Sequence, residues 1–129
     1  MLLGRAERRF DVAATSVDVL TANHSRVDVV KIDVEGAEDL VLEGMREGLA
    51  ARRYRALLLE LHPELLRAKG VDPGSVTARL SDLGYRGWTI DSSSDAYRRA
   101  IDPGVAVDSL LQPLDRWRET PWPHLLWLC

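Results

Sequence analysis

The chain has 129 residues, which is enough for one domain with its own hydrophobic core. Its 17 basic and 20 acidic side chains leave a net charge of −3, which excludes the basic surface that general nucleic-acid binding requires. No apolar run approaches the roughly 20 residues of a membrane span, and the N-terminus does not read as a signal peptide. The single cysteine, Cys129, excludes an internal disulfide. We therefore expect a cytoplasmic protein that binds no nucleic acid and has no membrane span.

The first third of the chain predicts two strands and a short helix. Apolar residues alternate over Arg8–Thr15, which is typical of a strand with one wet face. Ser16 or Thr15 is a suitable cap for a short helix, Val17–Leu20. The run Val27–Val34 is rich in β-branched residues and apolar on both faces, which predicts a buried central strand of a parallel sheet.

After Gly36, apolar residues recur at helical spacing and predict a helix that packs against the sheet. The predicted apolar stripe comprises Ala37, Leu40, Val41, Gly44, Met45 and Gly48. Three acidic residues, Glu38, Asp39 and Glu43, are expected to face water or the helix N-terminus, where acids are favoured.

The remaining chain alternates further strands and helices. Strands are predicted at Tyr54–His62, Tyr85–Asp91 and His124–Cys129, and helices at Pro63–Lys69 and from the Asp72 cap to Gly84. Residues Ser92–Pro123 have no clean period, although Val105–Trp117 has room for a short helix. Alternating strands and helices predict an α/β fold with a parallel sheet.

Polar residues gather where two of these strands end. Asp33, Glu35 and Glu38 follow the strand Val27–Val34, and His62 closes the next predicted strand. Neighbouring parallel strands lie about 4.8 Å apart, so we expect these groups to converge at the carboxyl edge, where open α/β sheets bind ligands.

The segment Lys31–Glu38, KIDVEGAE, resembles the signature of the FkbM-like family of S-adenosylmethionine-dependent methyltransferases. The resemblance implies a partial class I methyltransferase sheet, Rossmann-like and mostly parallel, with an antiparallel last strand. On that pattern the four strands from Val27 onward would be the fourth to the seventh of seven, with His124–Cys129 as the seventh. The specific part of the resemblance covers residues 31–38.

One part of the family pattern is missing. The family pattern begins with a strand and a glycine-rich turn, followed by an acidic residue that grips the ribose of the cofactor. Gly4 is isolated and no GxG pattern occurs in the chain. We therefore expect residues 1–129 to be a single domain, the C-terminal portion of the fold, truncated or completed by a partner chain or a homodimer.

The resemblance implies S-adenosylmethionine as cofactor and a small-molecule acceptor, such as a hydroxyl of a sugar, lipid or secondary metabolite. The catalytic candidates are Asp33, Glu35 and His62, and the cofactor-binding candidates are Asp33, Gly36 and Glu38. Structural roles compete with each of these: the acids suit turn and helix capping, and His62 suits a helix cap. No metal is required, although carboxylates of Asp33 and Glu35 would suit a hard cation. Lys31 is expected to pair with Glu60 as a buried ion pair.

Two other interpretations stay open. The chain is alternatively a non-catalytic remnant or interaction module that pairs with another chain through an exposed sheet edge, covered at best by Arg8–Thr15. A third interpretation is an acidic metal site of an unrelated phosphoesterase or signalling domain, with Glu60 and Asp91 as further carboxylates.

Overall fold

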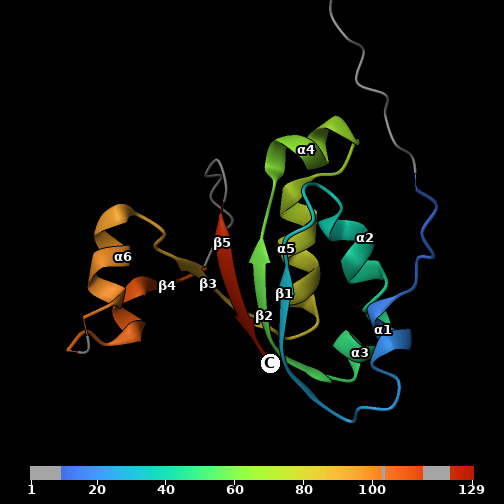
Figure 1. Ribbon diagram of the computed structural model, residues 1–129, viewed down its shortest axis with the longest axis horizontal. Coiled ribbons are helices and arrows are strands. Elements are labelled where there is room, and N and C mark those ends of the chain that lie inside the picture. Colours follow the sequence, from blue (N-terminus) through green and yellow to red (C-terminus); the bar gives the residue numbers. More distant parts are fainter. Residues whose placement is uncertain (1–9, 103, 115–122) are drawn as a thin grey trace, which may run out of the picture.

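In the computed structural model, which describes residues 10–102, 104–114 and 123–129, the chain forms a five-stranded mixed sheet. The strands are β1 (Val27–Ile32), β2 (Tyr54–Glu60), β3 (Arg86–Ile90), β4 (Leu111–Pro113) and β5 (His124–Leu128). Their order across the sheet is β1-β2-β5-β3-β4 (Figure 1). The α/β class predicted from the alternating pattern is confirmed.

The last strand, β5, is antiparallel as expected and inserts between β2 and β3. Since β1 pairs with β2 in parallel and β5 opposes both of its neighbours, β1, β2 and β3 run in one direction. The sheet is nevertheless less parallel than expected, because β4 adds a further antiparallel pair to β3. The carboxyl ends of β1 and β2 therefore meet at the same edge.

The helices are α1 (Val17–Leu20), α2 (Glu38–Glu43), α3 (Arg46–Ala50), α4 (Pro63–Ala68), α5 (Pro73–Asp82) and α6 (Ser94–Ala100), with a 3-10 turn η1 (Val107–Leu110). Figure 1 shows α6 and β4 at the opposite end of the molecule from α1, α2 and α3. Ser16 caps α1 by accepting from the Val19 amide, and Asp72 caps α5 by accepting from the Gly74 amide. No helix within the described ranges is long and apolar enough to cross a membrane.

The single helix predicted after Gly36 is instead two short helices, α2 and α3, and its buried stripe matches the prediction only in part. Met45 and Gly48 are buried as expected, but Leu40 is 66% exposed, and the unpredicted Glu38, Leu42 and Leu49 are fully buried. Both stripes have helical spacing, so periodicity alone did not distinguish them. Glu38 lies in the first turn of α2, as one of the two predicted positions requires, but its side chain is buried and does not face water.

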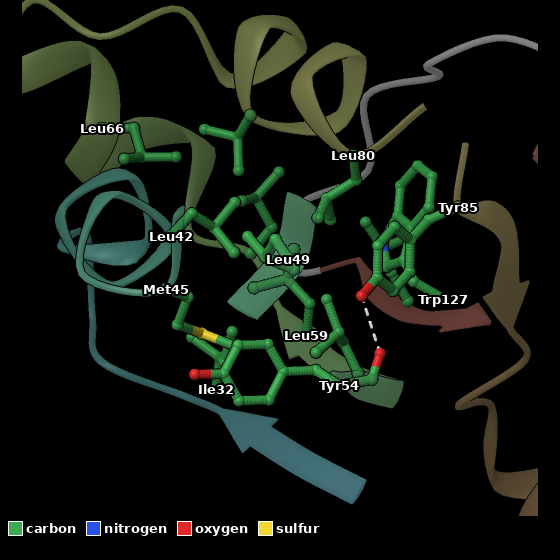
Figure 2. Packing of buried hydrophobic residues seen from close by; sticks show 14 residues of the cluster. Ile32, Leu42, Met45, Leu49, Tyr54, Leu59, Leu66, Leu80, Tyr85 and Trp127 are labelled. Atoms are coloured by element: carbon green, nitrogen blue, oxygen red, sulfur yellow. Dashed lines mark hydrogen bonds between the residues drawn. The ribbon is translucent and has the colours of Figure 1, made fainter. Parts of the chain in front are cut away.

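The core lies between the helices α2 to α5 and one face of the sheet. Leu42, Met45 and Leu49 pack with residues of β1 and β2, including Ile32 and Leu59 (Figure 2). Leu66 of α4 and Leu80 of α5 extend the cluster, and Trp127 of β5 closes it. The Tyr85 hydroxyl donates to the Tyr54 carbonyl oxygen at 2.7 Å within this core (Figure 2).

Two predictions about the sheet edge are wrong. The described part of the first predicted strand, residues 10–15, has no strand structure, and Phe10 and Val12 are exposed. Strand β1 is thus an edge strand of the described sheet, and Val29 on it is 57% exposed. Apolar alternation and β-branching favour strands, but neither supplies the neighbour that a buried central strand needs. Arg8 and Arg9 lie outside the described residues.

The segment between β3 and β5 contains a helix that the sequence did not predict. Helix α6 is mostly polar and is capped by Ser93, whose hydroxyl accepts from the Ala96 amide. The helix predicted within Val105–Trp117 is confirmed only as η1, and residues 115–117 lie outside the described part of the chain.

Candidate functional site

A tight turn follows β1 and presents the KIDVEGAE segment at the carboxyl edge of the sheet. Glu35 and Gly36 adopt left-handed conformations, with φ of 48° and 88°. The Gly36 amide donates to Glu38 Oε1 at 3.1 Å, and Lys69 Nζ donates to the Gly36 carbonyl at 2.6 Å. A Cβ at Gly36 would lie 2.5 Å from the Leu65 Cβ, so only glycine fits between the turn and α4.

Glu38 holds His62 across the gap between the two strand ends. Glu38 Oε1 lies 2.6 Å from His62 Nδ1, and the side chains are 0% and 11% exposed. A carboxylate at Nδ1 favours the tautomer with the proton on that nitrogen, which leaves a lone pair on Nε2. The second oxygen, Oε2 of Glu38, is buried without a hydrogen-bond partner among the described residues.

Asp33 pairs with Lys31 at the open side of the edge. Lys31 Nζ donates to Asp33 Oδ2 at 2.7 Å. This bond, with the nearby imidazoles of His62 and His124, lowers the pKa of Asp33 despite some desolvation. The same bond raises the pKa of Lys31, with a smaller contribution from Glu60. The predicted buried Lys31–Glu60 pair is wrong, because Lys31 is exposed and contacts Asp33, just after the end of β1.

Asp33, Glu60 and His62 form one cluster. One ligand atom from each lies within 4.8 Å of the others. His62 Nε2 is 4.0 Å from Glu60 Oε1, and His124 Nε2 is 3.5 Å from Glu60 Oε2. Beside the cluster, a shallow and mostly apolar pocket of about 140 Å³ opens over β2, β5 and β3, next to Lys31, Glu60 and His124. The arrangement combines oxygen and nitrogen ligands with room for a small molecule.

The structure brings some of the predicted site residues together and leaves others apart. Asp33 and His62 belong to one cluster, as expected. Glu35 is exposed and makes no hydrogen bond or ion pair with any described residue. Gly36 shapes the turn, and Glu38 is too deeply buried for its side chain to reach a ligand except through His62.

Glu60 and His124 lie at the candidate site, although neither was among the predicted catalytic or cofactor-binding residues. Glu60 was expected as the partner of Lys31 and, in the third interpretation, as a further carboxylate of a metal site, and His124 only as the start of a strand. Their register explains the encounter, because Glu60 and His124 are paired residues of the antiparallel β2–β5 ladder. The alternation Glu60-Leu61-His62 was visible in the sequence, but the strand that joins β2 was not.

A comparison with protein families finds that the model of the methyltransferase FkbM domain matches residues 2–86. The match includes β1, β2, the turn at Gly36 and the residues Asp33, Glu38, Glu60 and His62. Neither the curated proteins nor the solved structures give a significant match to the chain.

Proposed function

Because the chain belongs to the FkbM methyltransferase family, we propose that it carries the acceptor side of an S-adenosylmethionine-dependent methyltransferase. The reaction would transfer the methyl group of the sulfonium to a hydroxyl of a small molecule, such as a sugar, lipid or secondary metabolite. The order and direction of the strands support a Rossmann-like sheet of the class I methyltransferase type. A cytoplasmic location belongs to the same proposal.

The observation that carries the proposal is the pair of Glu38 and His62. Methyl transfer to a hydroxyl needs alignment of donor and acceptor and removal of the hydroxyl proton. Glu38, buried at the first position of α2, fixes the His62 ring through Nδ1 and leaves Nε2, which lies 4.0 Å from Glu60 Oε1, as a proton acceptor. A base oriented by a third group is the arrangement that activates nucleophiles in unrelated enzymes.

The other members of the cluster would hold the acceptor. Asp33 has a lowered pKa and a lysine partner, so it is a poor base at neutral pH but a good hydrogen-bond acceptor for a hydroxyl. Glu60 Oε1 lies 4.0 Å from His62 Nε2 and suits the same purpose. The apolar pocket beside Glu60 offers a place for the carbon skeleton of the acceptor.

The cofactor side of the proposal rests on the turn at Gly36. Gly36 packs closely against Leu65 and fixes the shape of this turn, and the exposed Asp33 is the feature at this edge that a ribose or sulfonium would meet. The chain contains no GxG pattern, so we propose that a second segment or partner chain supplies the glycine-rich cofactor loop. Glu38 is not part of the proposed cofactor site, because its side chain is fully buried and contacts His62.

Calorimetric titration of the purified 129-residue chain with S-adenosylhomocysteine tests the cofactor side. Micromolar binding that is lost in Gly36→Val, but kept in Gly70→Val, supports a pocket at the β1 turn. Gly70 is the matched control because its φ is also positive, at 79°, and nothing lies within 4 Å of an added Cβ. If neither the chain nor a chain extended at its N-terminus by a strand and a glycine-rich loop binds the probe, the proposal is wrong.

One observation favours a second candidate function, a protein-interaction module. Strand β1 has no partner on its outer side in the described sheet, and such an edge is a template for pairing with another chain. The two functions are compatible if the partner chain is also the one that completes the cofactor site.

A further inference from the structure

We propose that Asp33, Glu60 and His62 bind a divalent first-row transition-metal ion of the manganese or zinc class. The proposal goes beyond the methyl transfer proposed above and concerns the same edge of the sheet. Two carboxylates and one imidazole are a donor set that suits such ions, whereas Mg²⁺ prefers oxygen ligands alone.

The spacing of the three groups permits such a site after a small contraction. Ligand atoms about 2.1 Å from a metal lie about 3.0–3.4 Å apart at octahedral or tetrahedral angles. The present separations are 4.0 Å between His62 Nε2 and Glu60 Oε1, and at most 4.8 Å within the cluster. Rotation of the half-exposed Asp33 and Glu60 side chains closes gaps of this size without moving β1 or β2.

The contact between Glu38 and His62 is the independent observation that points to a metal. Metal-binding histidines almost always donate their other ring N–H to a carboxylate or carbonyl, which fixes the ring and raises its basicity. Glu38 does this at 2.6 Å from a fully buried position, while the His62 Nε2 face is turned to Glu60. A histidine that only capped α4 would need no buried carboxylate behind it.

Lys31 is the competitor for this site. Its ammonium occupies Asp33 Oδ2, one of the oxygens that a metal would use. The Lys31 side chain is 62% exposed, so it can swing into solvent when a divalent ion arrives. The partners of Glu60 within 4.0 Å in the described chain are the imidazoles of His62 and His124, so this carboxylate has no bonded ammonium to lose.

Metal binding and direct proton acceptance by His62 exclude each other, since both use the Nε2 lone pair. In the metal-loaded protein the ion would lower the pKa of a bound hydroxyl and take over its activation. Because both forms of the protein would activate the hydroxyl, catalytic activity does not report whether the metal is bound. The test therefore measures binding of the ion directly.

The test is calorimetric titration of the metal-free chain with Zn²⁺, repeated with Mn²⁺ and Mg²⁺. We expect one equivalent to bind, with Mg²⁺ weakest, and affinity to fall more than about tenfold in Asp33→Asn, Glu60→Gln and His62→Ala. Glu38→Gln should weaken Zn²⁺ about 10- to 100-fold as an outer-shell change. His24→Gln, at an exposed histidine outside the cluster, is the matched control and should leave affinity unchanged.

Lys31→Gln gives a test that does not depend on removing a ligand, because loss of the competing ammonium should tighten Zn²⁺ binding. Nitrogen spectra of the His62 ring should also show Nε2, and not Nδ1, shifting with Zn²⁺. No binding at millimolar Zn²⁺ and Mn²⁺, or binding that His24→Gln removes and the cluster variants retain, would overturn the proposal. Binding of S-adenosylhomocysteine with the chelator EDTA present separates failure of this site from failure of the methyltransferase function.

Discussion

At the residue scale, both the backbone conformation and the packing at position 36 require glycine. A Gly36→Ala substitution meets both a left-handed φ and the Leu65 side chain, whereas Gly70→Ala meets only a left-handed φ. We expect Gly70→Ala to cost about 1 kcal/mol and Gly36→Ala about 1–3 kcal/mol more, the usual cost of overpacking. Urea denaturation of the two variants measures the difference, and equal losses would show that α4 yields to the added methyl group.

Tyr85 gives a pH dependence at the alkaline end. Burial, followed by the charge of Cys129, raises the pKa of Tyr85 from 10.0 to about 12. Since the folded pKa exceeds the unfolded one, this group stabilises the fold fully below pH 10, and its contribution is lost as the pH rises toward 12. The loss is about 2–3 kcal/mol.

Thermal or urea unfolding between pH 9 and 12 checks this expectation. Tyr85→Phe should make the alkaline fall shallower, while lowering stability at neutral pH through loss of the hydrogen bond to the Tyr54 carbonyl. Tyr97→Phe, at an exposed tyrosine on α6, is the control. A slope in Tyr85→Phe as steep as in the original chain would assign the alkaline fall to other groups.

At the element scale, α3 is held by the side chain of Asp18, which lies 29 residues before Glu47 in the chain. Asp18 of α1 accepts from the Glu47 amide at 2.8 Å, the Gly48 amide at 2.9 Å and the Tyr54 hydroxyl at 2.6 Å. Burial by itself would raise the pKa of Asp18, but the bond from Tyr54, the two amides and Arg53 lower it overall. One carboxylate thus joins α1, α3 and β2.

Because the folded pKa of Asp18 lies below 3.8, its contribution is present above that pH and is lost as the pH falls further. Asp18→Asn should destabilise the chain by about 1–3 kcal/mol at pH 7 and flatten the acid limb of the stability curve. Asp28→Asn is the matched control, since Asp28 is exposed and pairs only with Arg26 among described residues. A control loss as large as that of Asp18→Asn would contradict the role assigned to Asp18.

The elements themselves were predictable where local signals and packing agree. Ser16, Asp72 and Pro63 mark helix starts, and the apolar runs of β1, β2, β3 and β5 were assigned within two residues at either end. The failures have a common cause, which is long-range pairing. Residues 10–15 alternate but have no strand beside them, and the buried position of Glu38 depends on His62, which is 24 residues away.

The candidate site was also predictable only in part. The strand ends placed Asp33 and His62 at one edge, because β1 and β2 are consecutive parallel strands. The sequence did not indicate that Lys31 would turn to Asp33, or that His124 would arrive beside Glu60 from the far end of the chain. These contacts depend on the register and position of β5, which a pattern of apolar residues does not specify.

At the scale of the whole molecule, the unpaired outer edge of β1 bears on whether the chain forms dimers in solution. The described sheet ends there without a covering strand, and Val29 is exposed on it. Proteins blunt such edges with lysine or proline to avoid pairing with other chains, but the ammonium of the one lysine on β1, Lys31, is bound to Asp33. We therefore expect the chain to form dimers that dissociate on dilution, detected as a concentration-dependent mass in light scattering.

Val29→Lys should shift this equilibrium toward the monomer several-fold, since two β1 edges would bring two ammonium groups together. Val12→Lys is the matched control, because Val12 is 84% exposed but lies in the irregular segment before α1. A chain that stays monomeric at all concentrations, or a control that acts as strongly as Val29→Lys, would rule out β1 as the pairing edge. If pairing occurs and S-adenosylhomocysteine strengthens it, the second chain contributes to the cofactor site, because a ligand stabilises only the state that binds it.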